Sequence, residues 1–189
     1  MYDERVKRSS HSFQKLDEQV GKFVRGSERS VLLNKVVRMS RENIPQMITF
    51  NKAAIDMEPW ERSSNVTTIS STVAEVNLMT LMRDMLCHTI VPAVFGSGLL
   101  DKYPSLVQDI ITLDAGVPVF LMDLPILIPW PGIARAHMAR RRLWSVMDEL
   151  QTQLDKYARG EETDYSWGDL DDVSELILER NKIWRGIYT

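Results

Sequence analysis

Apolar residues recur at intervals of three and four along most of this 189-residue chain, and this helical spacing restricts its fold more than any other feature. Strict alternation of apolar and polar residues, which would indicate half-buried strands, is scarce. The clearest stripes fall within residues 6–23, 33–47, 78–89, 106–113 and 143–154. The sequence therefore predicts a mainly α fold, organised as a single helical domain over residues 1–189 with no internal boundary.

Prolines and glycines mark the expected ends of these helices. Residues 51–71 are mostly polar and are expected to form a loop anchored by Pro59-Trp60. Pro92 should bend or end the helix that follows. A further helix is expected over residues 104–119, weakened at Gly116 and Pro118, and the proline-rich run over 125–132 cannot be regular helix. The next helix is expected over about residues 134–157.

Composition excludes several classes of function. A net charge of −3, with 26% charged and 44% hydrophobic residues, gives no reason to expect nucleic-acid binding. The single cysteine, Cys87, excludes an internal disulfide and a multi-cysteine metal site. Residues 1–25 are too polar for a signal peptide or a membrane anchor. No run reaches the roughly 20 apolar residues that a spanning helix needs.

No catalytic or metal-ligating residue is expected. Cys87 and His88 are adjacent on a predicted helix and point about 100° apart, so they are poorly placed to share a metal or act as nucleophile and base. A buried thiol beside a helix-surface histidine is the favoured interpretation. The acidic pairs at 148–149 and 161–162 lie on predicted exposed faces, without apolar surroundings that would raise a carboxyl pKa.

An apolar loop followed by arginines is the clearest candidate for a binding surface. Arg135 and the run 140–142 lie just after it and form either a solvated helix face or a contact with anionic lipid. A tryptophan in such a loop could lie at the level of the lipid headgroups. The expected membrane-contact residues are Leu124, Ile126, Leu127, Ile128 and Trp130.

Six short motifs occur in a recognisable order from residue 59 to residue 185. They are PWER (59–62), VFG (94–96), LLDKYP (99–104), LPILIPWPG (124–132), ARRRLWSVMDELQ (139–151) and WGDLDDVSELILERNKIWR (167–185). Together they resemble the D to H helix region of cytochromes P450, especially the microsomal type of fungi. The resemblance implies a partial P450 fold that comprises only helical parts.

The same resemblance assigns roles to segments of the chain. Residues 104–119 would be the F helix, 124–132 the F–G loop that faces the bilayer, and 139–151 the G helix. These elements form the roof of the substrate pocket in the family. The substrate contacts implied by the resemblance are Asp114, Val117, Phe120 and Leu121.

The motifs that make a P450 an enzyme do not occur in this chain. Its one partial match to the haem loop, Phe23 to Gly26, has Ser30 where the family has its cysteine ligand. The Glu-x-x-Arg pair, the oxygen-binding turn and the Trp-x-x-x-Arg pattern are also missing. P450 chemistry needs a thiolate on the haem iron. We therefore expect the chain by itself to hold no cofactor and to be inactive.

Two interpretations of function remain open at this stage. The chain could be an internal fragment of a haem-thiolate monooxygenase, whose complete form would use an NADPH reductase to oxidise an apolar small molecule. It could instead be a non-enzymatic helical interaction or membrane-surface protein of P450 ancestry. A haem-free enzyme that holds a substrate in an apolar pocket is a weaker third possibility. The expected location is the cytoplasm or the surface of the endoplasmic reticulum membrane.

Overall fold

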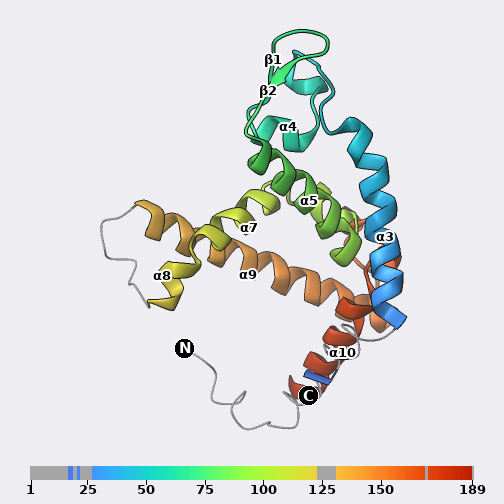
Figure 1. Ribbon diagram of the computed structural model, residues 1–189. Coiled ribbons are helices and arrows are strands. Elements are labelled where there is room, and N and C mark those ends of the chain that lie inside the picture. The colour runs from blue at the N-terminus through green and yellow to red at the C-terminus, as the bar shows by residue number, and fades with distance from the viewer. Residues whose placement is uncertain (1–16, 19–20, 22–26, 123–130, 169, 189) are drawn as a thin grey trace. The chain divides into compact units, whose positions relative to one another are not determined.

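A computed structural model describes residues 17–18, 21, 27–122, 131–168 and 170–188. Most of these residues are helical, so the predicted mainly α class is confirmed (Figure 1). They form two compact units, a first unit of residues 1–97 with 171–189 and a second unit of residues 98–170. The two units are groups of residues that contact one another more than the rest of the chain. Such a division does not by itself define separate domains, so the expected single domain stays a prediction.

The first unit contains helices and one small hairpin. Its elements are α3 (Ser27–Asn43), η1 (Ile44–Gln46), η2 (Ala54–Asp56), α4 (Pro59–Ser63), β1 (Thr67–Thr68), β2 (Ala74–Glu75), α5 (Leu78–Phe95) and α10 (Glu175–Tyr188). Helices α3 and α5 pack against each other, and the Asn43 amide donates a 2.9 Å hydrogen bond to the Thr89 hydroxyl. Strands β1 and β2 pair antiparallel, with Thr67 opposite Glu75.

The PWER motif forms helix α4, so the expectation of a mostly irregular stretch over 51–71 is wrong in part. Pro59 occupies the first turn, where a missing N–H costs nothing. A reciprocal capping box between Glu58 and Glu61 closes the N-terminus. Trp60 is buried, and its indole N–H donates to the Met47 carbonyl at 3.2 Å. The predicted anchor at Pro59-Trp60 is therefore present.

Helix α5 continues past Pro92 and ends at Phe95, three residues later, so the expected end at Pro92 is wrong, whereas the alternative of a bend there stays a prediction. Pro92 lacks an N–H and so cannot complete the helical bonding pattern at its own position. The residues after it are held by a distant segment, since Ser174 donates to the Val94 carbonyl from its N–H at 3.1 Å and its hydroxyl at 2.6 Å. The Ser97 N–H donates to the Asp172 carboxylate at 2.8 Å.

Among the described residues, α5 is the one helix long and apolar enough by length and composition to cross a membrane. One third of its 18 residues are buried within the protein, as in a helix that packs partly into a core. Pro92 and the half-buried His88 interrupt its apolar surface.

The second unit is built around one long helix. Its elements are α6 (Gly98–Lys102), α7 (Leu106–Ala115), α8 (Val117–Leu121), α9 (Pro131–Ala158) and η3 (Tyr165–Trp167); a further turn, η4 (Leu170–Asp172), begins at its end. Helix α9 covers the predicted helix over 134–157. Its buried face comprises Ile133, Ala136, Ala139, Leu143, Val146, Leu150 and Leu154. Four of these were predicted from the sequence.

The helix expected over 104–119 is divided at Gly116 into α7 and α8, at the position where glycine and proline were expected to weaken it. A Cβ at Gly116 would lie 2.4 Å from the Cβ of Ala136, so α7 ends where it closely approaches α9. The Gly116 N–H caps α7 by donating to the carbonyls of Thr112 and Leu113, at 3.1 and 3.0 Å. Pro118 then starts α8 within its first turn.

Candidate functional site

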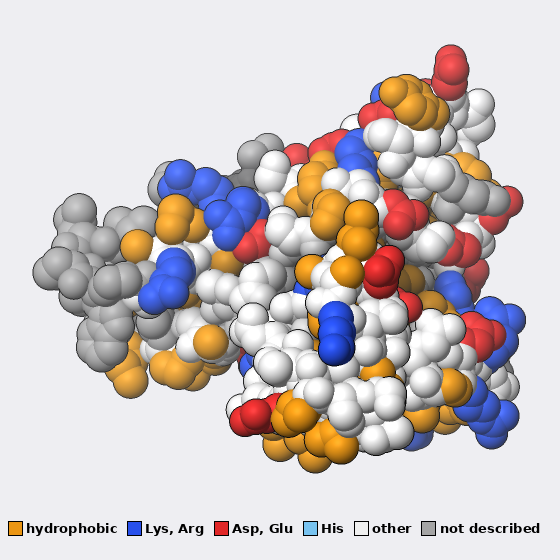
Figure 2. All heavy atoms as spheres, turned by 90° about the horizontal axis from the view of Figure 1, so that it is seen from above, with side chains coloured by type: hydrophobic (Ala, Val, Ile, Leu, Met, Phe, Trp, Pro, Cys, Tyr) orange, Lys and Arg blue, Asp and Glu red, His pale blue; other side chains and the backbone are white. Residues whose placement is uncertain are grey.

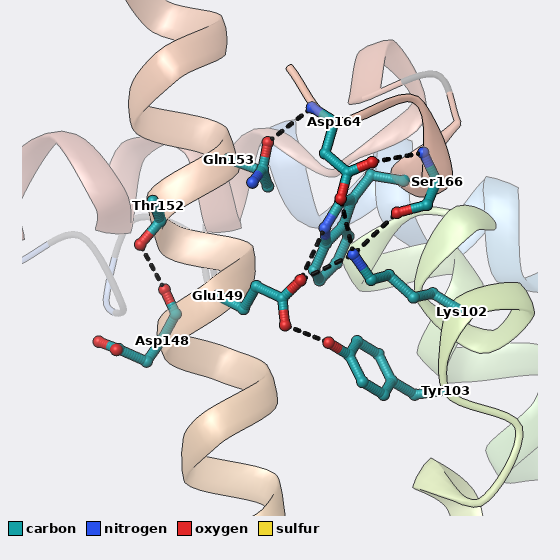
Figure 3. A network of polar contacts seen from close by, with 9 residues as sticks. Lys102, Tyr103, Asp148, Glu149, Thr152, Gln153, Asp164 and Ser166 are labelled. Carbon is teal, nitrogen blue, oxygen red and sulfur yellow. Dashed lines mark hydrogen bonds and ion pairs between the residues drawn. The ribbon is translucent and has the colours of Figure 1, made fainter.

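A polar network joins helix α6, the middle of α9 and the turn at 164–167 within the second unit (Figure 3). The Lys102 ammonium lies 2.7 Å from the Glu149 carboxylate, 3.2 Å from Asp164 and 2.8 Å from the Ser166 hydroxyl. The Tyr103 hydroxyl donates to the second Glu149 oxygen. The Trp167 ring lies 4.7 Å from the ammonium, close enough for a cation–π contact.

The charges in this network stabilise one another. Burial by itself would lower the pKa of Lys102, but its hydrogen bonds with Glu149 and Asp164 raise that pKa above the ordinary value. The hydrogen bond from Lys102, followed by that from Tyr103, lowers the pKa of the Glu149 carboxyl. Burial and the bond to Glu149 raise the pKa of Tyr103. Near neutral pH the carboxylate is therefore ionised, and Lys102 and Tyr103 are protonated.

This network acts as a structural clamp. Lys102 has three N–H donors and three acceptors within hydrogen-bonding distance. Asp148, the sequence neighbour of Glu149, points away from the cluster, as Figure 3 shows. The acidic pair at 148–149 therefore does not form a pair of facing carboxylates. Glu149 was expected on an exposed face, and this expectation is wrong. Its side chain is only partly exposed, at 39%, because it is bonded to Lys102, Tyr103 and Trp167.

An apolar pocket of about 680 Å³ lies in the second unit. Ligand sites in proteins commonly occupy about 300–1,000 Å³ and are lined mainly by apolar groups. Helix α7 contributes Ile111 and Ala115, one turn apart on the same face. The remaining lining includes polar Gln108, Thr112 and Arg135 and apolar Pro118, Met122 and Ile133. In size and lining this pocket is the best candidate for a binding site in the described chain.

An ion pair fixes the two helices that form most of this pocket. The Arg142 guanidinium on α9 donates to both oxygens of the Asp109 carboxylate on α7, at 2.9 and 2.5 Å. Asp109 is buried, whereas the Arg142 side chain is 57% exposed. The hydrogen bonds and negative charge of Asp109 raise the pKa of Arg142. A bidentate ion pair of this kind has a defined geometry, so it restrains the orientation of α7 relative to α9.

The expected substrate contacts lie near the pocket in sequence, on helices α7 and α8. Asp114 is exposed, as are Val117 and Leu121, which are 42% and 80% exposed. Phe120 is partly buried, with its ring 5.1 Å from the His137 ring and 5.2 Å from the Arg140 guanidinium. The described residues that line the pocket do not include these four. Their assignment as substrate contacts stays a prediction.

The expected membrane contacts at Leu124, Ile126, Leu127, Ile128 and Trp130 lie outside the described residues. In the middle of α9, the described part of the chain carries an exposed aromatic side chain. Trp144 is 68% exposed, and the Arg140 guanidinium lies 5.2 Å from its ring. An arginine beside an exposed tryptophan is compatible with a lipid surface and with solvent.

The one cysteine of the sequence lies in the first unit. Cys87 lies inside helix α5 and is partly buried, so the expectation of full burial is wrong. Its neighbour His88 is also partly buried, bonded through Nδ1 to the Asp84 carbonyl at 2.8 Å and packed at a ring distance of 6.0 Å on Trp60. Within the described part of the chain, no group of three His, Cys, Asp or Glu residues could hold a metal ion.

Comparison with protein-family models, curated proteins and solved structures gives no match. The P450 resemblance therefore depends on the sequence motifs.

Sequence reasoning missed the pocket and the clamp. The stripe within 106–113 predicts a buried face that includes Ile111, but this side chain is only partly buried and lines the pocket. The adjacent small residues Ala115 and Gly116 were the available signal, since small side chains allow a close helix approach and leave space beside it. The clamp had no local signal, because Lys102, Glu149 and Asp164 are separated by 47 and 15 residues.

Proposed function

We propose that this chain is a cytochrome P450-type helical region that forms the roof of a substrate pocket. The observation that carries the proposal is the packing of helices α7 and α9 against each other, held by the Asp109–Arg142 ion pair. These helices cover the segments whose motifs resemble the F and G helices. The interrupted helix and the close crossing at Gly116 support a role in enclosing a small molecule rather than a purely structural one.

In this proposal the chain supplies binding surface and no reacting group. Asp114, Val117, Phe120 and Leu121 contact an apolar substrate in the complete protein. The haem of that protein, held by residues beyond those described here, supplies the oxidation chemistry with electrons from an NADPH reductase. The chain by itself lacks the thiolate ligand and is inactive.

A second candidate is a non-enzymatic protein at a membrane surface or in a protein complex. The observation that favours it is a stripe of exposed apolar side chains on α5, at Leu78, Met79, Leu86 and Ile90, which are between 40% and 79% exposed. Figure 2 shows apolar side chains on the surface among charged ones. The segment 124–130 would add a membrane contact at the cytoplasmic side of the endoplasmic reticulum.

A chimera tests the first candidate. Residues 104–151 replace the F–G region of a well-expressed fungal P450, and product profiles are compared with those of the parent. We expect a changed profile, and a further change when Phe120→Ala is introduced. Arg141→Ala, on an exposed position of α9, serves as the control and should leave the profile of the chimera unaltered. A chimera that folds with haem but keeps the parental profile in every variant would contradict the proposal.

A further inference from the structure

One face of helix α7 forms a wall of the apolar pocket in the second unit. Four of its side chains line the pocket at three- and four-residue spacing, namely Gln108, Ile111, Thr112 and Ala115. This spacing places them on one side of the helix. All the described lining residues belong to the second unit, and none of the four expected substrate contacts is among them. The Asp109–Arg142 ion pair holds α7 against α9, and a pocket with fixed walls loses little conformational entropy when a ligand binds.

The lining favours a ligand without a formal charge. Aliphatic groups from α7, α8 and α9 form most of the wall, including Ile111, Pro118 and Ile133. Among the described lining residues Arg135 carries the one formal charge, and it already interacts with another group. No described lining residue carries a carboxylate that would bind a cation. Because a charge buried without a partner costs much more free energy than a neutral group, a neutral molecule is favoured.

Two polar groups on the α7 wall can bind a single hydroxyl group. The Thr112 hydroxyl donates its hydrogen to the Gln108 carbonyl at 2.7 Å, so its oxygen can only accept from a ligand. The exposed side-chain amide of Gln108 can both donate and accept. Since the two residues are neighbours on the helix surface, a ligand hydroxyl between them can donate to Thr112 and accept from Gln108.

We propose that this chain by itself binds a neutral aliphatic alcohol in the apolar pocket, with the hydrocarbon part against Ile111 and Ala115 and the hydroxyl beside Gln108 and Thr112. The proposal goes beyond the roof function, because it uses none of the four expected substrate contacts and needs no haem. Binding is non-covalent, so no bond forms or breaks.

Isothermal titration calorimetry of the full 189-residue chain with 1-decanol tests the site. Ala115→Phe places an aromatic ring in the pocket, and Ser145→Phe adds one at an exposed position of α9 that does not line it. We expect saturable binding by the parent, parental binding by Ser145→Phe, and binding weaker by about tenfold or more for Ala115→Phe, because the added ring occupies the space of the ligand. Gln108→Trp, at an exposed lining position, repeats the test should Ala115→Phe not fold. No saturable binding, or equal weakening by the ring in the pocket and the ring at 145, would overturn the proposal.

An isomeric ligand tests the hydroxyl assignment. Methyl nonyl ether contains the same atoms as 1-decanol but has no hydroxyl hydrogen, so it should bind about threefold to tenfold more weakly. Thr112→Val removes the acceptor and keeps the branched shape, so it should weaken binding of 1-decanol and leave binding of the ether unchanged. Decanoate and decylammonium should both bind more weakly than the alcohol. Equal binding of alcohol and ether, no effect of Thr112→Val, or tighter binding of either ion would refute the assignment of a neutral alcohol.

The outcomes separate this inference from the roof proposal. The titrations use the chain without haem, whereas the chimera is measured by the product profile of a haem-containing enzyme. Absence of 1-decanol binding together with a changed product profile would overturn the pocket inference alone. Saturable 1-decanol binding together with a parental profile in every chimera variant would overturn the roof proposal alone.

Discussion

Gly98 shows how one residue can depend on a distant part of the chain. A Cβ at this position would lie 1.9 Å from the Trp167 carbonyl oxygen, which is far inside van der Waals contact. The turn at 164–167 therefore lies directly against the start of α6. That contact brings the Asp164 carboxylate and the Trp167 ring to Lys102, so the clamp depends on the absence of a side chain at residue 98.

Gly98→Ala should lower the free energy of unfolding by about 1–3 kcal/mol, because the clash is with backbone that has to move. Gly160→Ala is the control. Nothing lies within 4 Å of a Cβ there, but its φ of +69° is unfavourable for alanine. We expect this control to cost about 1 kcal/mol. Urea denaturation followed by circular dichroism compares the two, and an equal or smaller loss at Gly98 would contradict the close contact.

Glu149 makes the stability of the second unit depend on pH. Its pKa in the folded protein is lowered from 4.5, so its contribution is present above pH 4.5 and is lost as the pH falls through the folded value. Glu149→Gln should be less stable than the parent at neutral pH and should flatten the decrease in stability below pH 4.5. Thermal melts between neutral pH and acid measure this slope. Glu161→Gln, on an exposed residue, should retain the parental slope.

At the scale of elements, helix α4 and the end of α5 are stabilised by polar contacts that periodicity does not reveal. Glu61 is completely buried, yet its carboxylate accepts bonds from the Thr49 N–H at 2.8 Å, the Thr49 hydroxyl at 2.9 Å and the Glu58 N–H at 2.8 Å. Buried charges are tolerated when donors surround them in this way. The carboxylate therefore joins the short helix to the segment that precedes it.

Glu61→Ala should destabilise the protein by about 2–3 kcal/mol, since it leaves buried N–H and hydroxyl donors without an acceptor. Glu42→Ala, on an exposed residue of α3, is the control and should change the unfolding free energy by less than about 0.5 kcal/mol. Denaturation in urea measures both. A small effect of Glu61→Ala would show that water replaces the carboxylate easily, and would contradict the importance of the capping contacts.

At the scale of the whole molecule, the features described above are divided between the two units. The candidate pocket and the clamp belong to the second unit, and the thiol belongs to the first. P450 oxidation chemistry requires a thiolate on the haem iron. The proposed role of the chain by itself is to supply binding surface.

Purified protein mixed with haem, reduced and treated with carbon monoxide should not give the Soret band of a thiolate-ligated haem. The reason is that Cys87, the one cysteine of the sequence, does not stand in the haem-loop pattern of the P450 family, and that the Glu-x-x-Arg pair does not occur. Absorption spectroscopy of the parent and of Cys87→Ala provides the measurement, and the two spectra should be the same. A thiolate-type band that disappears in Cys87→Ala would refute the proposal that the chain by itself is inactive.

The sequence by itself determined the helical class, the buried stripe of α9 and the anchor at Pro59-Trp60. These features depend on which face of a helix is apolar, and the spacing of nearby residues in the sequence reveals that face. Leu143, Val146 and Leu150 recur at three- and four-residue spacing and are buried as expected. The anchor at Pro59-Trp60 likewise depends on two adjacent residues, of which Trp60 is buried as an anchor requires.

Only the tertiary structure decided the continuation of α5 past Pro92, the break at Gly116, the clamp and the pocket. Each depends on groups that are distant in sequence. Ser174 supports the end of α5 from 80 residues away, and the Lys35 ammonium donates to the Asp172 carbonyl across 137 residues. Spacing patterns report which face of a helix is buried, but the partner of a polar group and the space between two helices arise only when those segments pack together.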